Sequence, residues 1–464
     1  MNKRMAIFAT MLFLAFSAHG QTHHYLKNGE ESTGGTWNTT STYTPGTNTQ
    51  IWLQGEEVDT GGSTTSTHTI RNGIFTLKGL GVGRYNKNTS QVVVDAATIN
   101  ADSSFWIGMY GNGTLTIQNG SAVTVAGKAD VGYASGGKGT LTVTGTNSVL
   151  TIQGNDGLRL GSNLTHSGIS GTLNISQGGA VFVTNAVRVA SLSGDGYVFI
   201  DNGTLNSGAI YVGCDNSNKR TTGKGTFTLT SGVVSMNDHL RVGNGEVNLN
   251  GGNLTTTQKV AAYSGTTNFS GTAVTLDALL VGGNAATAEY PAVVNFEGGS
   301  IDSTTATQVR AYGTLNINAT NPGDAFDQLT LLTNGVLNVG ARQTIDFFDT
   351  TGGELNTTSD GWLDILYDFE NPDVIHFDEV NIDGTLQVSF VQPWSSAYGS
   401  QFEIFTAENL EILGNLSLPN GFQVVSTEGR FVIGKENELP EPSTWCLLIM
   451  GFLAVFRVRR PRTA

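Results

Sequence analysis

The sequence predicts an all-β protein, a right-handed parallel β-helix (solenoid) with a C-terminal β cap and a short C-terminal transmembrane helix. Three observations support this fold class. Short runs of alternating polar and apolar residues fill the middle of the chain. Similar runs return at intervals of 23 to 30 residues. An uncharged apolar stretch followed by arginines lies at the C-terminal end.

The first repeated element begins with Gly. Its third and fifth residues are apolar, while its second and fourth are polar. This alternation is typical of a β-strand with one buried face. The element occurs at residues 113–117, 139–143, 171–175, 225–229, 245–249 and 313–317.

Two further short strands follow the first in most repeats. The second occurs at 122–125, 149–152 and 180–183, and the third ends on an apolar residue followed by a small one. Three strands in such an interval form one coil of a parallel β-helix, in which neighbouring coils bury the apolar side. Gly permits positive φ at the turns, and Asn and Thr side chains can pair between coils. The third strands end at Gly108, Gly132, Gly161, Ala190, Gly213 and Gly243, with successive intervals of 24, 29, 29, 23 and 30 residues.

The composition divides the chain into five segments. We expect a signal peptide at residues 1–20, an N-terminal cap with the first coils at 21–95, and the β-helix repeats at 96–345. From about residue 346 Gly becomes rarer and acidic and aromatic residues more frequent, so we expect a C-terminal β cap or small sandwich at 346–435. A sorting tail with a transmembrane helix follows at 436–464. Caps are expected because an open solenoid end exposes apolar surface and unpaired strand edges.

The N-terminal end has the three parts of a secretory signal. Lys3 and Arg4 are its basic residues, and an uncharged, mostly apolar run of 14 residues follows at 5–18. Ala18 and Gly20 are small residues at the −3 and −1 positions of a cleavage site. This pattern predicts export and removal of the first 20 residues.

The C-terminal end combines a proline-containing motif, an apolar run and a basic cluster. The uncharged run at 443–456 has 14 residues, fewer than the roughly 20 that span a membrane comfortably. Basic residues stay in the cytoplasm, so the preceding chain is expected outside the inner membrane. Such a short membrane anchor is suited to a processing intermediate whose tail is later cleaved. The motif is Pro440, Glu441 and Pro442, and the membrane stop is Arg457, Arg459 and Arg460.

Two resemblances follow from these residues. The tripeptide, apolar helix and arginine-rich end at 440–464 resemble the PEP-CTERM sorting signal of Gram-negative bacteria. That resemblance implies an exosortase, a membrane protease-transpeptidase, as processing partner, and a host that makes an exopolysaccharide matrix. The repeats resemble the autotransporter-associated β-strand repeats of bacterial surface passenger domains over about half of the chain. An ordinary single-span anchor is the alternative for the tail.

The charge distribution argues against nucleic acid as a partner. The formal net charge is −14, and without the basic residues of the two ends and Glu441 the body holds 18 basic and 37 acidic residues. Binding to phosphate backbones requires clustered Lys and Arg. The two cysteines, Cys214 and Cys446, are not expected to form a disulfide because they fall in different segments.

We assign no catalytic residue, metal ligand or cofactor from the sequence. Asp130, Asp156, Asp195 and Asp215 are scattered singly, whereas glycan-cleaving sites cluster carboxylates with a base. The residues most similar to a catalytic group are Asp238 and His239, followed by Arg241. We favour the interpretation that they form a polar turn before a strand. Ca²⁺ binding by the aspartates of the terminal region stays an alternative, although their spacing matches no known Ca²⁺-binding loop. These aspartates are Asp364, Asp368, Asp373, Asp378 and Asp383.

These features predict a structural or adhesive, adhesin-like protein of the cell envelope. It would be an inner-membrane-anchored intermediate first, and then lie at the cell surface or in the extracellular matrix, where exopolysaccharide is a candidate partner. The alternative is a glycan-active β-helix enzyme, a polysaccharide lyase or hydrolase, with a site assembled across coils.

Overall fold

The computed structural model describes residues 22–26, 36–38, 49–53 and 65–435. The last range has gaps at 72–73, 84–88, 162–167, 218, 284–285, 320–322, 324, 327, 348–349, 351, 360, 368–374, 392–394, 396–400 and 427–428. The predicted signal peptide with Ala18 and Gly20 lies outside the described residues. So does the sorting tail, with Pro440, Glu441, Pro442, Arg457, Arg459, Arg460 and the expected transmembrane helix. Among the described residues, no helical segment has the length and hydropathy to span a bilayer.

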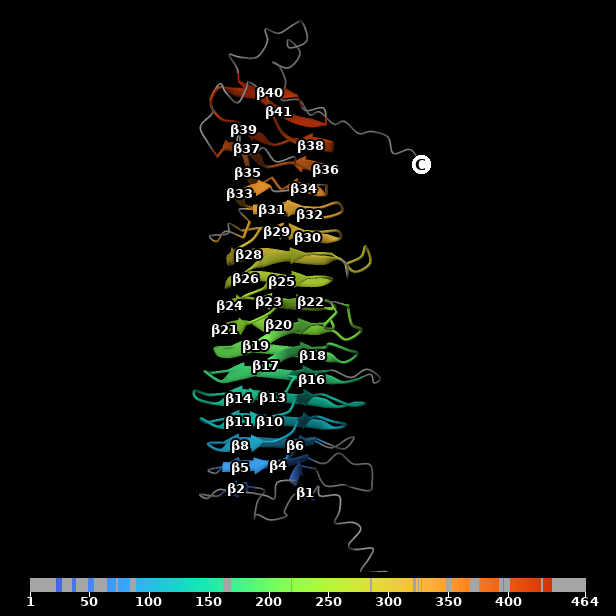
Figure 1. The fold of residues 1–464 in the computed structure, drawn as a ribbon, viewed down its shortest axis with the longest axis vertical. Helices are drawn as coiled ribbons and strands as arrows, with labels where there is room; N and C mark the ends of the chain where they lie inside the picture. Colours follow the sequence, from blue (N-terminus) through green and yellow to red (C-terminus); the bar gives the residue numbers. More distant parts are fainter. Residues whose placement is uncertain are drawn as a thin grey trace, which may run out of the picture. The chain divides into compact units, whose positions relative to one another are not determined.

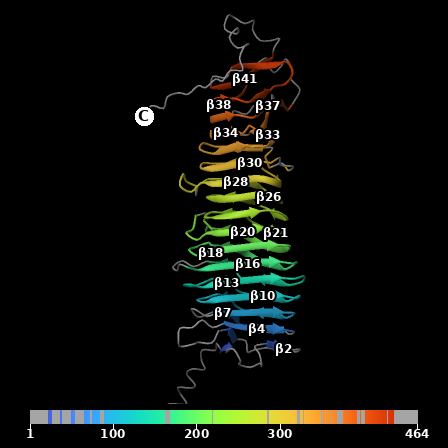
Figure 2. The same cartoon turned by 180° about the vertical axis from the view of Figure 1, so that it is seen from behind.

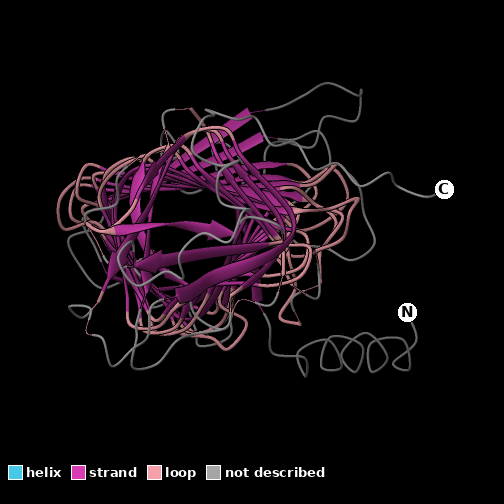
Figure 3. Cartoon of the chain, turned by 90° about the horizontal axis from the view of Figure 1, so that it is seen from above, coloured by secondary structure: helices cyan, strands magenta, loops and turns pink. Residues whose placement is uncertain are grey.

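The chain forms two compact units, Met1–Ser207 and Gly208–Ala464. Within each unit the strands lie one above another, from blue to green in the first and from green to red in the second (Figures 1 and 2). Figure 3 colours every described segment as strand or loop. The all-β fold class is therefore confirmed for the described residues.

The first unit contains eighteen complete strands among its described residues, most of them three to seven residues long. They are β1 (Thr22–Leu26), β2 (Thr36–Asn38), β3 (Thr49–Leu53), β4 (Thr65–Arg71), β5 (Ile74–Leu77), β6 (Gly79–Val82), β7 (Thr89–Asp95), β8 (Thr98–Ala101), β9 (Phe105–Ile107), β10 (Asn112–Gln118), β11 (Ala122–Val125), β12 (Ala129–Val131), β13 (Lys138–Thr144), β14 (Val149–Ile152), β15 (Leu158–Leu160), β16 (Ser170–Ser176), β17 (Ala180–Val189) and β18 (Asp195–Asp201). The boundary between the units falls within β19 (Gly203–Val212).

The second unit continues with strands of similar length. They are β20 (Gly225–Leu229), β21 (Gly232–Met236), β22 (Leu240–Val242), β23 (Gly245–Leu249), β24 (Asn253–Thr256), β25 (Lys259–Ala262), β26 (Gly265–Leu276), β27 (Ala278–Val281), β28 (Ala292–Ser303), β29 (Thr307–Val309), β30 (Gly313–Ile317), β31 (Gln328–Leu331), β32 (Val336–Val339), β33 (Arg342–Phe347), β34 (Glu354–Thr357), β35 (Trp362–Tyr367), β36 (His376–Ile382), β37 (Thr385–Phe390), β38 (Gln401–Ile412), β39 (Asn415–Ser417), β40 (Phe422–Ser426) and β41 (Arg430–Lys435).

Strands in the first unit pair in parallel with the equivalent strand one coil later. β7, β10, β13 and β16 form one such series, β8, β11 and β14 a second, and β9, β12 and β15 a third. Three strands per coil, in parallel register, is the pairing of a β-solenoid. Leu115, Leu141 and Leu173 are aligned between coils and are each at most 1% exposed. The predicted alternation therefore places apolar residues in the core.

Five of the six small residues that end the third strands, all except Gly243, adopt left-handed backbone conformations. φ is 68° at Gly108, 68° at Gly132 and 62° at Gly161. Ala190, at the same place in the next coil, has a φ of 55°. A Cβ on Gly161 would lie 1.9 Å from the carbonyl oxygen of Asp195. Gly is therefore required there for its φ and for the close approach of the next coil.

The second unit changes its coil pattern along the chain. β20, β23, β26, β28 and β30 form one parallel series, and from β30 onward two strands recur per coil instead of the expected three.

Parallel pairing continues through the range of the expected cap. β34 pairs with β36, β36 with β38, and β37 with β39, all in parallel. Antiparallel pairing begins where β41 joins β38 and β40. Phe405 lies between Phe377 and Phe431 with ring centroids 5.5 and 5.1 Å away. These rings bury the apolar core where the parallel series ends.

Candidate functional site

The most regular polar feature of the second unit is a column of asparagines on its first strands. Each is half-buried and lies between two buried residues, which are apolar except for Thr267 and Thr357, so its side chain is on the outer face of the sheet. The backbone pairs each asparagine with the next one in the series. The column, called here the asparagine ladder, consists of Asn248, Asn268, Asn295, Asn316, Asn338, Asn356 and Asn381.

Hydrogen bonds join all successive members of the ladder. In each case the Nδ2 of one asparagine donates to the Oδ1 of the asparagine one coil before it. Asn316 donates to Asn295 at 2.7 Å, and Asn338 donates to Asn316 at 2.6 Å. The remaining four donor–acceptor distances, from Asn268, Asn295, Asn356 and Asn381 to their predecessors, are 2.7, 2.8, 3.0 and 2.9 Å.

The ladder retains capacity for outside partners. A carboxamide has two N–H donors and two acceptor lone pairs, and an inner rung uses one of each within the ladder. Glutamates accept further bonds at two rungs, from Asn268 to Glu246 at 3.3 Å and from Asn381 to Glu379 at 3.0 Å. The remaining donors and acceptors lie on a half-exposed surface and repeat once per coil.

The equivalent column in the first unit is mixed and consists of Val93, Thr116, Thr142, Asn174 and Phe199. Thr116 is aligned with Thr142, and Thr142 with Asn174, whose Nδ2 lies 3.4 Å from the Thr142 Oγ1. The expected pairing of Asn and Thr between coils is confirmed at these positions. Most rungs of the ladder were not identified from the sequence because their strands lack the full Gly-Thr-Leu signature. An Asn directly preceded and followed by an apolar residue or Thr is the signal that could have found them.

The Asp238, His239 and Arg241 constellation is divided between separate contacts. His239 Nδ1 contacts the carboxylate of its neighbour Asp238. Arg241 instead donates from Nη1 to the Asn216 carbonyl at 3.2 Å, and its Cζ lies 5.4 Å from the Tyr211 ring centroid. Arg241 therefore stabilises the loop that contains Asn216 and packs against the Tyr211 ring.

Asp130 takes part in a buried ion-pair cluster in the first unit. Its side chain is 1% exposed and receives hydrogen bonds from Arg159 Nε at 2.5 Å and Nη2 at 2.9 Å. Lys128 Nζ lies 3.2 Å from the same carboxylate. Bidentate pairing with Arg is a strong, directional contact. Asp130 thereby joins two coils, since Arg159 is aligned with it one coil later.

Two of the terminal aspartates, Asp364 and Asp378, accept hydrogen bonds from protein groups. Asp364 accepts from Gln387 at 3.0 Å and from Ser389 at 2.9 Å. Asp378 accepts from the Gly353 amide at 2.8 Å. Among the described residues, no three His, Cys, Asp or Glu side chains are grouped so that they could hold a metal. Asp368 and Asp373 lie outside the described residues.

No protein-family model, curated protein or solved structure matches this chain. Its function has to be inferred from its own residues and their geometry.

Proposed function

We propose that this protein is an exported structural and adhesive solenoid of the cell surface or extracellular matrix, with exopolysaccharide as its partner. The observation that carries the proposal is the seven-residue asparagine ladder on an outer sheet face. We take the winding to be right-handed, because that is the hand of nearly all parallel crossover connections.

The ladder suits a repeating polymer. Neighbouring parallel strands lie roughly 4.8 Å apart, so each coil presents a similar carboxamide at that spacing. Sugar hydroxyls can both donate to and accept from such groups. The rungs are already ordered by their mutual hydrogen bonds, so binding would cost little side-chain entropy. A long, weakly interacting surface favours adhesion through many contacts.

The two ends support export and sorting. We propose that residues 1–20 are removed at Gly20, and that Pro440, Glu441 and Pro442 form a PEP-CTERM motif processed by an exosortase-type enzyme. Before processing, the apolar helix and the stop at Arg457, Arg459 and Arg460 would hold the protein in the inner membrane. The solenoid would then pass to the surface or matrix.

The aspartate carboxylates contact other side chains of the protein, which favours a structural protein over a glycan-active enzyme. Asp130 is engaged by Arg159 and Lys128, and Asp364 by Gln387 and Ser389. A general acid or base must instead reach its substrate. We propose neither a cofactor nor a Ca²⁺ requirement.

Co-sedimentation of the purified protein with exopolysaccharide from its host tests the proposal. We expect binding by the wild type, and at least about threefold weaker binding by the triple variant Asn295→Ala, Asn316→Ala, Asn338→Ala, since each rung contributes only a modest hydrogen bond. Asn318→Ala, at an exposed asparagine directly after β30 and outside the ladder, is the matched control. Unchanged binding by the folded triple variant would remove the ladder's role. Glycan cleavage abolished by one carboxylate substitution would favour the enzyme alternative.

A further inference from the structure

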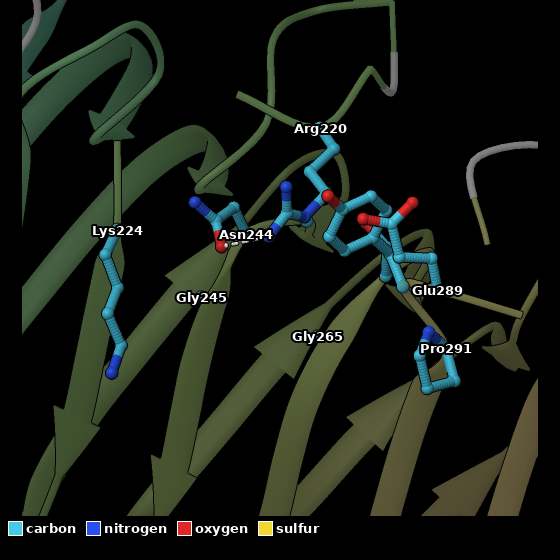
Figure 4. Close-up of a pocket in the computed structure, with 10 residues that line it drawn as sticks. Arg220, Lys224, Asn244, Gly245, Gly265, Glu289 and Pro291 are labelled. Carbon is cyan, nitrogen blue, oxygen red and sulfur yellow. Dashed lines mark hydrogen bonds between the residues drawn. The ribbon is translucent and has the colours of Figure 1, made fainter. Parts of the chain in front are cut away.

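Two loops of the second unit border a small, open pocket beside the sheet. One loop follows β19 and includes Arg220 and Lys224, and the other precedes β28 and includes Glu289 and Tyr290 (Figure 4). The pocket has a volume of about 230 Å³. This is below the roughly 300 Å³ at which typical small-molecule pockets begin, so the space suits one monosaccharide unit.

Arg220 is held in position by two contacts. Its Nη2 donates to Asn244 Oδ1 at 2.8 Å, and its Cζ lies 3.8 Å from the centre of the Tyr290 ring. Asn244 in turn donates to the carbonyls of Thr222 and Gly223 at 3.2 and 3.0 Å, which fixes the loop. A guanidinium has five N–H donors, so these contacts leave donors for a ligand. Arg220 is therefore preorganised on an aromatic surface.

The second loop is equally well defined. Tyr290 and Thr287 exchange backbone hydrogen bonds at 3.1 and 3.2 Å, and the Tyr290 amide also lies 3.1 Å from the Thr287 hydroxyl. A hydrogen bond with Glu289 is the main cause that raises the pKa of the Tyr290 hydroxyl. Tyr290 is 38% exposed, so part of its ring is available beside Arg220.

The floor of the pocket lacks large side chains. Gly243, Gly245 and Gly265 line it, and a Cβ on Gly265 would lie 2.1 Å from the Gly243 carbonyl oxygen. Ser264 also lines the pocket and is 2% exposed. Its hydroxyl has no hydrogen-bond partner within the described part of the chain. A buried hydroxyl without a partner is costly, and a ligand hydroxyl would satisfy it.

The pocket is basic although the chain is acidic. Arg220 and Lys224 outnumber Glu289, whereas the whole chain has a formal net charge of −14. In Figure 4 Lys224 lies on the opposite side of Asn244 from Arg220. An anionic group attached to a polar ring would meet a cation, an aromatic ring and amide or hydroxyl groups in one place.

We propose that this pocket binds a carboxylated sugar, a uronic acid residue of a glycan, with its carboxylate on Arg220 and its ring beside Tyr290. Planar guanidinium matches carboxylate geometry. The choice of a glycan over an acidic peptide as the ligand rests on the proposed adhesive function. Binding at this site would make the protein select acidic polysaccharides over neutral ones.

Titration calorimetry of the full-length protein with a short oligogalacturonate tests the assignment, and a neutral oligosaccharide of equal length serves as the ligand control. Arg220→Ala should weaken oligogalacturonate binding at least about tenfold, because it removes charge-assisted hydrogen bonds. Glu289→Gln should strengthen it about two- to fivefold by removing a repulsive charge. Arg430→Ala, an equal charge change at an arginine that pairs with Glu403 on β38, should leave it within about twofold.

The possible outcomes separate the two proposals. Absence of oligogalacturonate binding, equal binding of the neutral oligosaccharide or of an acidic peptide, or wild-type affinity in Arg220→Ala would each overturn the pocket assignment. If Arg220→Ala is unfolded by circular dichroism, Arg220→Gln replaces it with the same expected loss. Host exopolysaccharide that still binds Arg220→Ala fully would refute the pocket and leave the adhesive function standing. Selective uronate binding by a protein found in the cytoplasm would support the pocket assignment and refute the proposed adhesive function.

Discussion

Asn316 donates a hydrogen bond from Nδ2 to Oδ1 of Asn295 over 2.7 Å, although the two residues are 21 positions apart in the chain. The bond connects consecutive coils, and Asn316 accepts an equivalent bond from Asn338. A side-chain ladder therefore runs parallel to the backbone ladder. It stabilises the stack of coils and places polar groups on its surface.

Removing one inner rung should destabilise the second unit. Asn316→Ala loses two hydrogen bonds on a half-exposed face, where water replaces part of their energy, so we expect about 1 kcal/mol and a melting temperature lower by about 2–4 °C. Thermal unfolding followed by circular dichroism measures this. Asn318→Ala, at an exposed asparagine directly after the end of β30, should change little. Equal effects of both variants would contradict the ladder's contribution.

The left-handed conformation at the end of the third strands can be tested with a reciprocal pair. Gly161→Ala should lower stability by about 2 kcal/mol or more, because the new Cβ meets the Asp195 carbonyl oxygen in a conformation unfavourable to Ala. Ala190→Gly, in the next coil, should be close to neutral because Ala already occupies that conformation. Chemical denaturation compares them, and a Gly161→Ala protein as stable as the wild type would disprove the close approach.

Asp95 should make the first unit sensitive to acid. The hydrogen bond from Asn119 at 2.6 Å is the main cause that lowers the pKa of Asp95, burial acts in the opposite direction, and Arg71 lowers it further. Because the pKa of Asp95 in the folded protein is below the ordinary value of 3.8, ionised Asp95 contributes its full stabilisation of the fold above pH 3.8. It is lost as the pH falls through the folded pKa.

Melting curves of wild type and Asp95→Asn across the acid range check this expectation. The difference between the two proteins should be largest above the ordinary pKa of 3.8 and should shrink as the pH falls through the lowered pKa of folded Asp95. Asp102→Asn, at an exposed aspartate in the same unit, is the control. A constant difference at every pH would mean that the charge of Asp95 does not stabilise the fold.

Cys214 should be unreactive in the folded protein. Its side chain is buried, and burial raises the pKa of the thiol to about 12. The thiolate is the reactive form, so a thiol reagent at about pH 8 should modify Cys214 only after unfolding. A Cys446→Ser variant leaves Cys214 as the one thiol of the chain. Rapid modification of that variant under native conditions would contradict the burial of Cys214.

The sorting tail can be tested by deletion. Removing Pro440 to Ala464 should release the protein from the membrane into the periplasm or medium, since both the motif and the apolar run are lost. Immunoblots of cell fractions and the mass of the mature protein measure this. Substituting Pro440, Glu441 and Pro442 alone should retain the membrane anchor and block processing. A deletion variant that remains in the membrane would rule out the sorting role of the tail.

Local patterns predicted the local structure well. The Gly-Thr-Leu runs, such as 113–117 and 171–175, are strands with buried third and fifth residues. Even the substitution of Ala190 for Gly was placed correctly, with its positive φ. These properties depend on neighbours in the chain, through the period of two and the steric limits on φ.

The later coils were less predictable. The expected three strands per coil become two from β30 onward, while parallel pairing continues. The number of strands in a coil depends on how its connections pack, which a single repeat does not encode. The signal peptide and the sorting tail lie outside the described residues, and their roles remain predictions from the sequence.

The sequence by itself determined the strand type, the buried face and the parallel stacking of coils, because alternation and turn residues act over a few neighbouring positions. Only the tertiary structure decided that seven asparagines hydrogen-bond in one column, and that Arg220 meets Asn244 and Tyr290. Residues separated by 18 to 70 positions come together through the register between coils of unequal length. That register follows from packing of the coils against one another, and local sequence does not specify it.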